Sequence, residues 1–275
     1  MNSTPHKGKE IHLTEEKETL LITLYAKAID SRSPASVLHD TKADEVMGMI
    51  DYDFTKLQRS EHNSMIISVR AKQIDGWIQE FLRANPHCVV LQLGCGLDSR
   101  IERIHPSSTV SWFDVDYPEV IERRKNFFSN KEGYAMIESS VNETAWLKQI
   151  PGSRPALIVA EGVLEYFTEE GVKDLFNRLT GHFSHGEMIF DVMNSFAINS
   201  GKDSLKKLMG TEHKWAVDDI RAVDLLNGKL KRVSALSVFR SKCMKPLPLK
   251  YRLMYRMLSV FPRFRNMIRL LRYAF

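Results

Sequence analysis

Two glycines and two aspartates near the middle of the chain have the spacing of a nucleotide-cofactor site. Gly94 and Gly96 follow an apolar run at 89–93 that is typical of a buried parallel strand, and glycine there lets the backbone turn sharply and a ligand approach the main chain. About twenty residues later a second strand-like run ends in Asp114 and Asp116, whose carboxylates can accept hydrogen bonds from ribose hydroxyls in a βαβ unit. The pattern predicts an adenosine-containing cofactor. Asp116 is the first choice for the ribose, and Asp114 is the alternative that could instead brace the loop.

The residues after the glycines narrow the choice of cofactor. The dinucleotide fingerprint has a third glycine, which brings a helix N-terminus close to a pyrophosphate, and this chain has Ser99 at that position. Asp98 places a negative charge at the helix start, which would repel a pyrophosphate and attract an ammonium or sulfonium group. S-adenosylmethionine carries both groups and is the predicted cofactor. From these residues alone, an ordinary strand-to-helix turn without a ligand stays open as the alternative.

Three sequence runs in this order resemble the leucine carboxyl methyltransferase family, including its bacterial polyketide-type O-methyltransferase branch. They are LGCGLDSR at 93–100, FDVDYPEVIERRKNFF at 113–128 and AEGVLEYFTEEGVKDLF at 160–176. The resemblance extends from about Glu61 to Phe275. It implies an α/β fold of the Rossmann-like class I methyltransferase type, with a mostly parallel seven-stranded sheet flanked by helices. It also implies transfer of a methyl group to an oxygen atom.

The resemblance implies roles for individual residues around the cofactor. Gly94 and Gly96 should line its methionine part, and Glu161, directly after a predicted strand at 156–160, should face the cofactor and can pair with its ammonium group. The alternative for Glu161 is a capping role for the helix that follows. Arg70 lies in a predicted helix upstream of the glycines and matches a family arginine that holds the cofactor carboxylate through parallel hydrogen bonds.

The adenine end of the predicted site departs from the family pattern. Related enzymes generally carry an acidic residue near the adenine amino group, but the matching segment after the strand at 134–138 has Ser140 there, followed by Val141 and Asn142. A serine hydroxyl can still accept a hydrogen bond from an amine. Ser140 and Val141 are therefore assigned to the adenine, with backbone atoms as the alternative means of recognition.

The sequence says less about the methyl acceptor. Tyr166 lies six positions after the strand at 156–160, where it can border an acceptor pocket or pack at the start of a helix. A carboxylate acceptor, with a pKa of roughly 4, is ionised at neutral pH and needs no base, whereas a phenol or an alcohol benefits from one. No histidine or aspartate stands out beside the expected transfer point, which favours a carboxylate over a hydroxyl.

No metal site and no disulfide is predicted. The three cysteines form no C-x-x-C pair, and His182 and His185 have metal-ligand spacing without a third ligand nearby. Such cysteine usage is typical of a reducing cytoplasm, and no run approaches the roughly 18 apolar residues of a membrane span. A soluble cytoplasmic protein is therefore expected.

Helical spacing dominates the first third of the chain, and strands alternate with helices in the rest. Residues 1–13 are polar and expected to be disordered. Residues 1–84 are expected to form a helical lid over the acceptor or, alternatively, a dimer contact, and residues 85–275 the cofactor-binding core. Helices are predicted at 15–30, 43–50 and 65–84, and strands at 88–93, 109–114, 134–138, 156–160, 187–192, 231–239 and 270–275, with a late strand antiparallel.

The C-terminal region is unusually basic. The chain has a formal net charge of +5, and no acidic residue follows Asp224. Lysines and arginines alternate there with Leu, Met, Tyr and Phe, a composition that suits an anionic membrane, a nucleic acid or an acidic carrier protein. The favoured interpretation is a strand and a helix packed on the core, with arginines that reach solvent.

Three functions remain open from the sequence. The first is an S-adenosylmethionine-dependent O-methyltransferase that acts on a carboxylate or hydroxyl of a polyketide-like or other small secondary metabolite, free or carrier-bound. The second is a protein methyltransferase that modifies a C-terminal carboxyl group. The third is a non-enzymatic binder of nucleic acid or anionic surfaces through the basic C-terminal region. The nearly complete cofactor set argues against the third, so no nucleic-acid partner is expected. The compact chain favours a small molecule over a protein, and an oligomer stays open.

Overall fold

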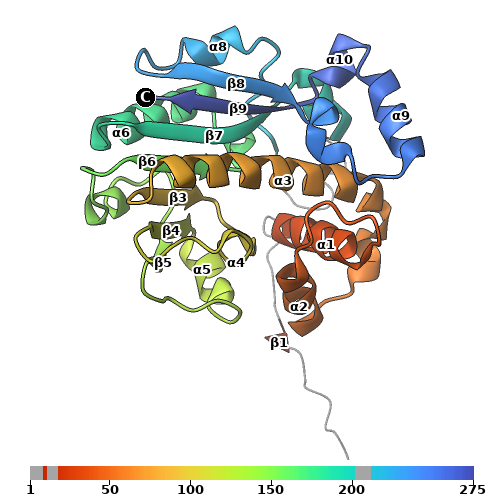
Figure 1. Cartoon of the computed structure of the whole chain (residues 1–275), viewed down its shortest axis with the longest axis horizontal. Helices are drawn as coiled ribbons and strands as arrows, with labels where there is room; N and C mark the ends of the chain where they lie inside the picture. The colour runs from red at the N-terminus through yellow and green to blue at the C-terminus, as the bar shows by residue number, and fades with distance from the viewer. Residues whose placement is uncertain (1–8, 11–17, 202–211) are drawn as a thin grey trace, which may run out of the picture.

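A seven-stranded sheet forms the centre of the fold, and helices cover both of its faces (Figure 1). The computed structural model describes residues 9–10, 18–201 and 212–275. The two predicted strands at 134–138 and 156–160 are confirmed residue for residue, and the ends of the others shift by one or two residues. The strands of the sheet are β3 (Val89–Leu93), β4 (Ser111–Asp116), β5 (Tyr134–Glu138), β6 (Ala156–Ala160), β7 (Gly186–Met193), β8 (Lys231–Ser237) and β9 (Ile268–Ala274).

The order of the strands across the sheet is β5-β4-β3-β6-β7-β9-β8. All neighbours from β5 to β7 are parallel, and β9 is antiparallel to both β7 and β8. The predicted Rossmann-like fold, mostly parallel with a late antiparallel strand, is thereby confirmed. From β3 the chain builds the sheet outward to β5, and from β6 it builds in the opposite direction. The crevice between the carboxyl ends of β3 and β6 is therefore the topological switch point, where sheets of this kind bind ligands.

Helix α3 (Glu61–Ala84) covers one face of the sheet. Every residue of β3 and β6 is buried, as expected for central strands that have helices on both sides. Ile74 and Ile78 of α3 belong to the same apolar cluster as Val90 and Leu157 of those strands. Figure 1 shows α3 running across the sheet. The rigid contact fixes the position of the arginine that α3 carries, Arg70.

Helix α6 (Glu169–His182) covers the opposite face. Its side chains Leu175 and Leu179 join a second apolar cluster with Leu91 and Ile158, the strand residues that alternate with those of the first face. The hydroxyl oxygen of Thr168 caps α6 by accepting a hydrogen bond from the Gly171 amide at 3.1 Å. The start of α6, and with it the preceding loop after β6, is therefore anchored.

The N-terminal helices α1 (Glu18–Arg32) and α2 (Thr41–Met49) pack together, and α1 also packs on α3. They correspond to the predicted helices at 15–30 and 43–50, although the expected cap at Thr14 lies outside the described residues. Disorder was expected throughout residues 1–13, and this is wrong for β1 (Lys9–Glu10), which pairs in parallel with β2 (Ile50–Asp51). The short helices are η2 (Phe54–Ser60), α4 (Arg100–Ile104), α5 (Pro118–Arg124), η3 (Trp146–Gln149), η4 (Leu164–Tyr166), α8 (Arg221–Asp224), η5 (Val238–Arg240) and η6 (Lys242–Met244).

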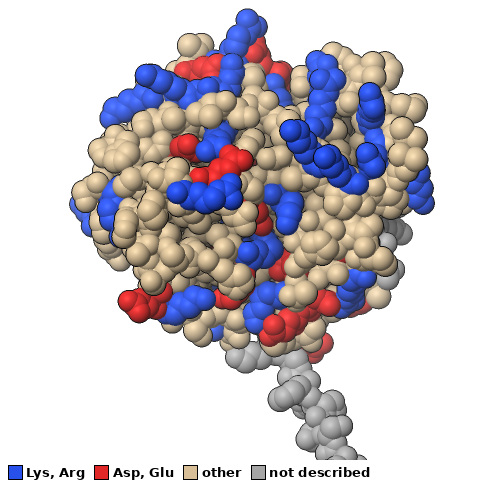
Figure 2. Space-filling view, in the orientation of Figure 1, with Lys and Arg blue, Asp and Glu red and all other residues tan. Residues whose placement is uncertain are grey.

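The helices α9 (Leu249–Leu258) and α10 (Pro262–Arg265) precede β9 and carry much of the basic C-terminal sequence. Figure 2 shows Lys and Arg side chains over this part of the surface, with uncharged residues between them. No helix in the described part of the chain is long and apolar enough to cross a membrane. The large apolar side chains exposed on this segment are Leu249, Leu253, Met254, Met257, Val260 and Phe261.

Candidate active site at the topological switch point

A cavity of about 600 Å³ opens at the switch point between β3 and β6. Helices α1 and α3, the loops after β3 and β6, and the C-terminal segment from α9 to β9 all contribute to its wall. A volume of this size holds a cofactor-sized ligand. The predicted site residues that line it are Arg70, Gly94, Gly96, Glu161 and Tyr166.

The glycine loop needs glycine for two separate reasons. Gly94 and Gly96 have φ angles of +62° and +52°, in the left-handed region that side chains disfavour. A Cβ atom on Gly94 would lie 2.4 Å from Cγ2 of Val163, and one on Gly96 would lie 2.8 Å from Cδ2 of Leu20. The loops after β3 and β6 and helix α1 therefore meet closely at the glycines. Any side chain there would disrupt this edge of the cavity.

Asp116 holds the glycine loop by its backbone. Its carboxylate accepts hydrogen bonds from the Gly96 amide and from the Tyr117 amide, each at 2.8 Å. Burial raises the pKa of Asp116 above its usual range, although these two amides oppose the shift. The residue lies directly beside the loop but does not line the 600 Å³ cavity. Its role in binding ribose, predicted from the spacing, stays a prediction.

Asp114, the alternative ribose ligand, is fully buried and braces the loop. It accepts hydrogen bonds from Arg124 Nη2 at 2.5 Å and from the Tyr134 hydroxyl at 2.7 Å. Arg124 Nη1 in turn donates to the carbonyl oxygens of Gly96 and Asp98, at 3.1 and 2.7 Å. The sequence left open which of the two aspartates binds the ribose, and in the fold the two have different contacts.

Arg70 is held by two acids at the cavity wall. Its Nε lies 3.1 Å from Oε1 of Glu161, and its Nη1 lies 2.8 Å from Oδ2 of Asp191, at the sixth position of β7. The other Asp191 oxygen accepts a hydrogen bond from the Gly162 amide at 2.7 Å. Although burial opposes the charge, Asp191 and Glu161 raise the pKa of Arg70, so it is a permanent cation. Arg70 lines the 600 Å³ cavity, its role in binding the cofactor stays a prediction, and its contacts with Glu161 and Asp191 were not predicted.

Two further cations surround the loop and were not found from the sequence. Lys27 of α1 lies 3.0 Å from Oδ1 of Asp98, and Arg100 Nη1 lies 3.0 Å from the other Asp98 oxygen. Arg100 is fully buried and also pairs with Asp75 and Glu161. Although burial opposes ionisation, Lys27, Arg100 and Arg70 hold the pKa of Glu161 at about 2. Only the helical spacing of Leu20, Thr23 and Lys27 on α1 could have pointed to Lys27.

Glu165, Tyr166 and His213 also line the cavity. Glu165 is 4% exposed, and its Oε2 atom has no hydrogen-bond partner among the residues that the structure describes. Burial, together with the nearby charge of Asp191, raises the pKa of Glu165 to about 8. The Tyr166 ring meets the His213 ring edge to face, with 5.0 Å between centroids. Burial raises the pKa of the Tyr166 phenol and lowers that of His213. Sequence reasoning found only Tyr166, because His213 lies far along the chain in a loop without a motif.

The predicted adenine residues lie after β5, outside the lining of the 600 Å³ cavity. Ser140 Oγ accepts a hydrogen bond from the Asn142 amide at 3.3 Å, and the side chain of Val141 is 7% exposed. The carboxyl end of β5 lies two strands from β3, on the same edge of the sheet. The assignment of Ser140 and Val141 to adenine therefore stays a prediction.

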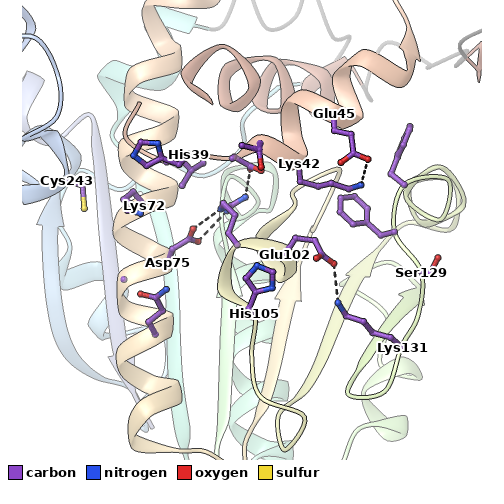
Figure 3. Close-up of a pocket in the computed structure, with 18 of the residues that line it drawn as sticks. His39, Lys42, Glu45, Lys72, Asp75, Glu102, His105, Ser129, Lys131 and Cys243 are labelled. Atoms are coloured by element: carbon purple, nitrogen blue, oxygen red, sulfur yellow. Dashed lines mark hydrogen bonds and ion pairs between the residues drawn. The ribbon is translucent and has the colours of Figure 1, made fainter. Parts of the chain in front are cut away.

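A second cavity, of about 880 Å³, lies between α2, α3, α4 and the loop at 127–131 (Figure 3). Its charged side chains largely pair with one another. Lys42 lies 2.8 Å from Glu45, and Lys131 lies 3.2 Å from Glu102. Asp75, which also lines this cavity, belongs to the ion pairs described above. We assign no ligand to it, because its charges are already neutralised locally.

The fold is of the Rossmann-like type that is also found in methyltransferases. A structure of an S-adenosylmethionine-dependent methyltransferase from Mesorhizobium loti has a TM-score of 0.50, with 12% identity, over 68% of this chain and 90% of that one. The methyltransferase domain of bacterial CtHen1-C also has a TM-score of 0.50 and 12% identity, over 74% of this chain and 98% of that one. At this identity the likeness concerns the fold alone.

Sequence comparison then identifies the family. Residues 13–180 match the sequence model of the family described as leucine carboxyl methyltransferase. The chain is 39% identical to the tetracenomycin polyketide synthesis O-methyltransferase TcmP of Streptomyces glaucescens, over 79% of this chain and 81% of that protein. It is 34% identical to the S-adenosyl-L-methionine-dependent methyltransferase dpfgK of Gibberella zeae, over 81% and 82%. The chain belongs to the leucine carboxyl methyltransferase family, which confirms the predicted resemblance and enzyme class.

Proposed function

We propose that this protein is an S-adenosylmethionine-dependent O-methyltransferase that methylates a carboxylate, or a hydroxyl, of a small molecule of secondary metabolism. One observation carries the proposal. A glycine turn with two left-handed residues lies at the switch point and faces a cavity whose wall holds buried charges of both signs. The similarity to TcmP, named for polyketide synthesis, supports a polyketide-like acceptor.

The residues at the cavity fit the charges of this cofactor. Arg70 and Lys27 supply cations for its carboxylate, and Glu161 supplies an anion for its ammonium group. Gly94 and Gly96 let the main chain approach the methionine part, since neither has a Cβ atom. Asp116, Ser140 and Val141 are proposed for the ribose and the adenine.

The bound cofactor supplies a methyl group on a sulfonium, which an oxygen nucleophile can displace in line. One O–C bond forms at the acceptor, and one C–S bond breaks, with its electron pair left on sulfur. A carboxylate loses no proton in this step, whereas a hydroxyl must give one up. The chief task of the protein is therefore to hold acceptor and donor close and aligned.

We propose that the acceptor occupies the part of the cavity that is lined by Glu165, Tyr166 and His213 together with apolar side chains, and we call this part the acceptor end. Its apolar side chains, which suit a largely apolar molecule, are Ile66, Phe239, Leu258, Phe264 and Met267. We propose that Tyr166 borders the acceptor and that residues 1–84 act as a lid, since α1 contributes to the wall from outside the sheet. We also propose that the protein is cytoplasmic and that its acceptor is anionic, either free or bound to a carrier.

Two other functions predict different binding partners and products. A protein C-terminal carboxyl methyltransferase would modify a peptide carboxylate in the same cavity and would show product on peptides but not on small acids. A non-enzymatic binder that uses the basic C-terminal region would bind nucleic acid or anionic vesicles and no cofactor. The similarity to methyltransferases of the leucine carboxyl methyltransferase family favours an enzyme over the binder.

The test is titration calorimetry of the whole protein with S-adenosylmethionine, and with NAD as the comparison ligand. We expect saturable binding of S-adenosylmethionine alone. Arg70→Lys should weaken that binding about tenfold or more, because a lysine lacks the several fixed donors with which arginine can bind Glu161 and Asp191 and still present a donor to the cofactor. Arg83→Lys, an exposed residue at the far end of α3, is the matched control. Absence of S-adenosylmethionine binding would overturn the proposed function.

A further inference from the structure

Three described residues of the cavity wall, Gln92, Arg100 and Glu165, have a buried side-chain atom without a hydrogen-bond partner, and the Oε2 atom of Glu165 is the carboxyl oxygen among them. Glu165 is 4% exposed, and no cation of the described residues pairs with it, unlike Glu161 on the same loop. Such a group usually has a ligand or a water as its partner. We propose that Glu165 forms the subsite for the carboxylate of the acceptor and that the carboxyl O–H of Glu165 donates a hydrogen bond to this carboxylate. This inference rests on the proposed function.

The surroundings explain why Glu165 keeps its proton. Arg70 is the nearby cation, but its Nε and Nη1 groups already bind Glu161 and Asp191. Burial, which removes the water that would stabilise the ionised form, is the main cause of the raised pKa of Glu165, and the charge of Asp191 adds to it, while a backbone hydrogen bond and the charge of Arg70 oppose the shift. Its pKa of about 8 means that most molecules carry the protonated form at neutral pH. The backbone carbonyl of Glu165 is anchored separately, since it accepts from the Lys214 amide at 2.7 Å.

A protonated carboxyl group distinguishes a carboxylate acceptor from a hydroxyl acceptor. It donates to an anionic oxygen and forms a charge-assisted hydrogen bond, which is stronger than a neutral one. Once ionised, it repels that same anion. For a hydroxyl acceptor the requirement is opposite, because the ionised form would be needed as a base. Ionisation of Glu165 at higher pH should therefore weaken the use of a carboxylate acceptor and favour the use of a hydroxyl acceptor.

The neighbouring titratable groups do not share this behaviour. His213, which faces Tyr166, has a pKa held below its usual value by burial, so it stays neutral above pH 6.5. Burial raises the pKa of Tyr166, so its phenol stays protonated. Arg70 is charged throughout, and Lys27, Arg100 and Arg70 keep Glu161 ionised although burial opposes its charge. Between pH about 6.5 and about 9, Glu165 is the group expected to titrate in this wall.

The experiment measures binding of 2-naphthoate to the full chain saturated with S-adenosylhomocysteine, at pH about 6.5 and about 9. The probe is an apolar carboxylate that remains ionised at both values. Affinity should fall about tenfold at the higher pH, because about a tenth of groups with a pKa near 8 remain protonated at pH 9. The neutral analogue 2-naphthamide should bind equally at both pH values.

Two variants separate the proposal from a general effect of pH. Glu165→Gln keeps a donor that does not titrate, so 2-naphthoate should bind at both pH values with nearly equal affinity. Glu170→Gln, on an exposed glutamate of α6, should behave as the unaltered protein. Affinity that rises with pH, a pH effect that survives in Glu165→Gln, or no naphthoate binding at all would overturn the proposal. Loss of S-adenosylhomocysteine binding itself would instead count against the proposed function.

Discussion

The glycine-loop end and the acceptor end of the cavity differ in whether their ionisable side chains have partners. At the glycine-loop end, Lys27, Arg70 and Arg100 each lie within 3.1 Å of an acidic oxygen. At the acceptor end, the buried Oε2 of Glu165 has no hydrogen-bond partner in the described part of the chain, and the surrounding wall is largely apolar. The difference fits the two molecules that the proposed function requires. A zwitterionic cofactor would exchange contacts with ion pairs that already exist, whereas the proposed acceptor would supply a hydrogen-bond partner for Glu165.

The paired end is also part of the folded framework. Buried ion pairs add little net stability, because desolvation offsets their attraction, but removing one partner leaves an uncompensated charge. Arg100 joins α4 to α3 and to the loop after β6 through Asp75 and Glu161. The acceptor end has no such network. Mutations at the two ends should therefore be separable into effects on folding and effects on binding.

The largest expected effect comes from Arg100→Met. Loss of this fully buried cation leaves Asp75, Asp98 and Glu161 short of a partner, and the free energy of unfolding should fall by about 3–5 kcal/mol. Urea denaturation followed by circular dichroism measures it. Arg83→Met, at an exposed position, should change the same quantity by less than about 0.5 kcal/mol. If the two variants were equally stable, the pairs at the glycine loop would not be part of the framework.

A second experiment examines the unpaired end without any ligand. The folded pKa of Glu165, about 8, lies above the ordinary value of 4.5, so the folded state binds the extra proton between these values. Stability is therefore lost as pH rises from about 5 to about 8, and on the order of a few kcal/mol is at stake. Urea denaturation at both pH values should show Glu165→Gln gaining stability relative to the unaltered protein as pH rises. Parallel pH profiles for the two proteins would contradict a neutral Glu165.

The two aspartates at the end of β4 offer a third, smaller contrast. Asp116→Asn removes a charge beside the glycine loop and should weaken S-adenosylmethionine binding about tenfold, since hydrogen bonds to a charged acceptor contribute about 1.5–3 kcal/mol. Asp114→Asn should mainly lower stability, because it leaves the guanidinium of Arg124 buried without its acid. Calorimetry and thermal unfolding on both variants give the two readouts. Interchanged results would mean that Asp114, not Asp116, faces the ribose.

The sequence predicts those parts of the site that depend on residues close together in the chain. Gly94, Gly96 and the strands beside them follow from short patterns, because a turn and a buried strand are encoded by neighbouring residues. Arg70 and Glu161 required the family resemblance, and they meet at 3.1 Å although 91 residues separate them. Helical spacing alone indicates the face of α1 that carries Lys27, and no local pattern indicates that Glu165 is buried in the cavity wall, because both depend on contacts between distant segments. The fold class was predictable, but the charge pairing was not.

The smallest expected effect concerns salt. The cofactor end contains buried pairs, which mobile ions screen weakly, whereas Lys250, Arg252 and Arg256 lie on the exposed surface of α9 near the acceptor wall. An anionic acceptor drawn in by these cations should bind two- to threefold more weakly as ionic strength rises from about 0.05 to about 0.5 M, since the Debye length falls from above 10 Å to below 8 Å. Binding of S-adenosylmethionine and of 2-naphthamide should change less over the same range. If 2-naphthoate binding were equally insensitive, the basic segment would play no part in attracting the acceptor. The difference between the two ends would then rest on Glu165 alone.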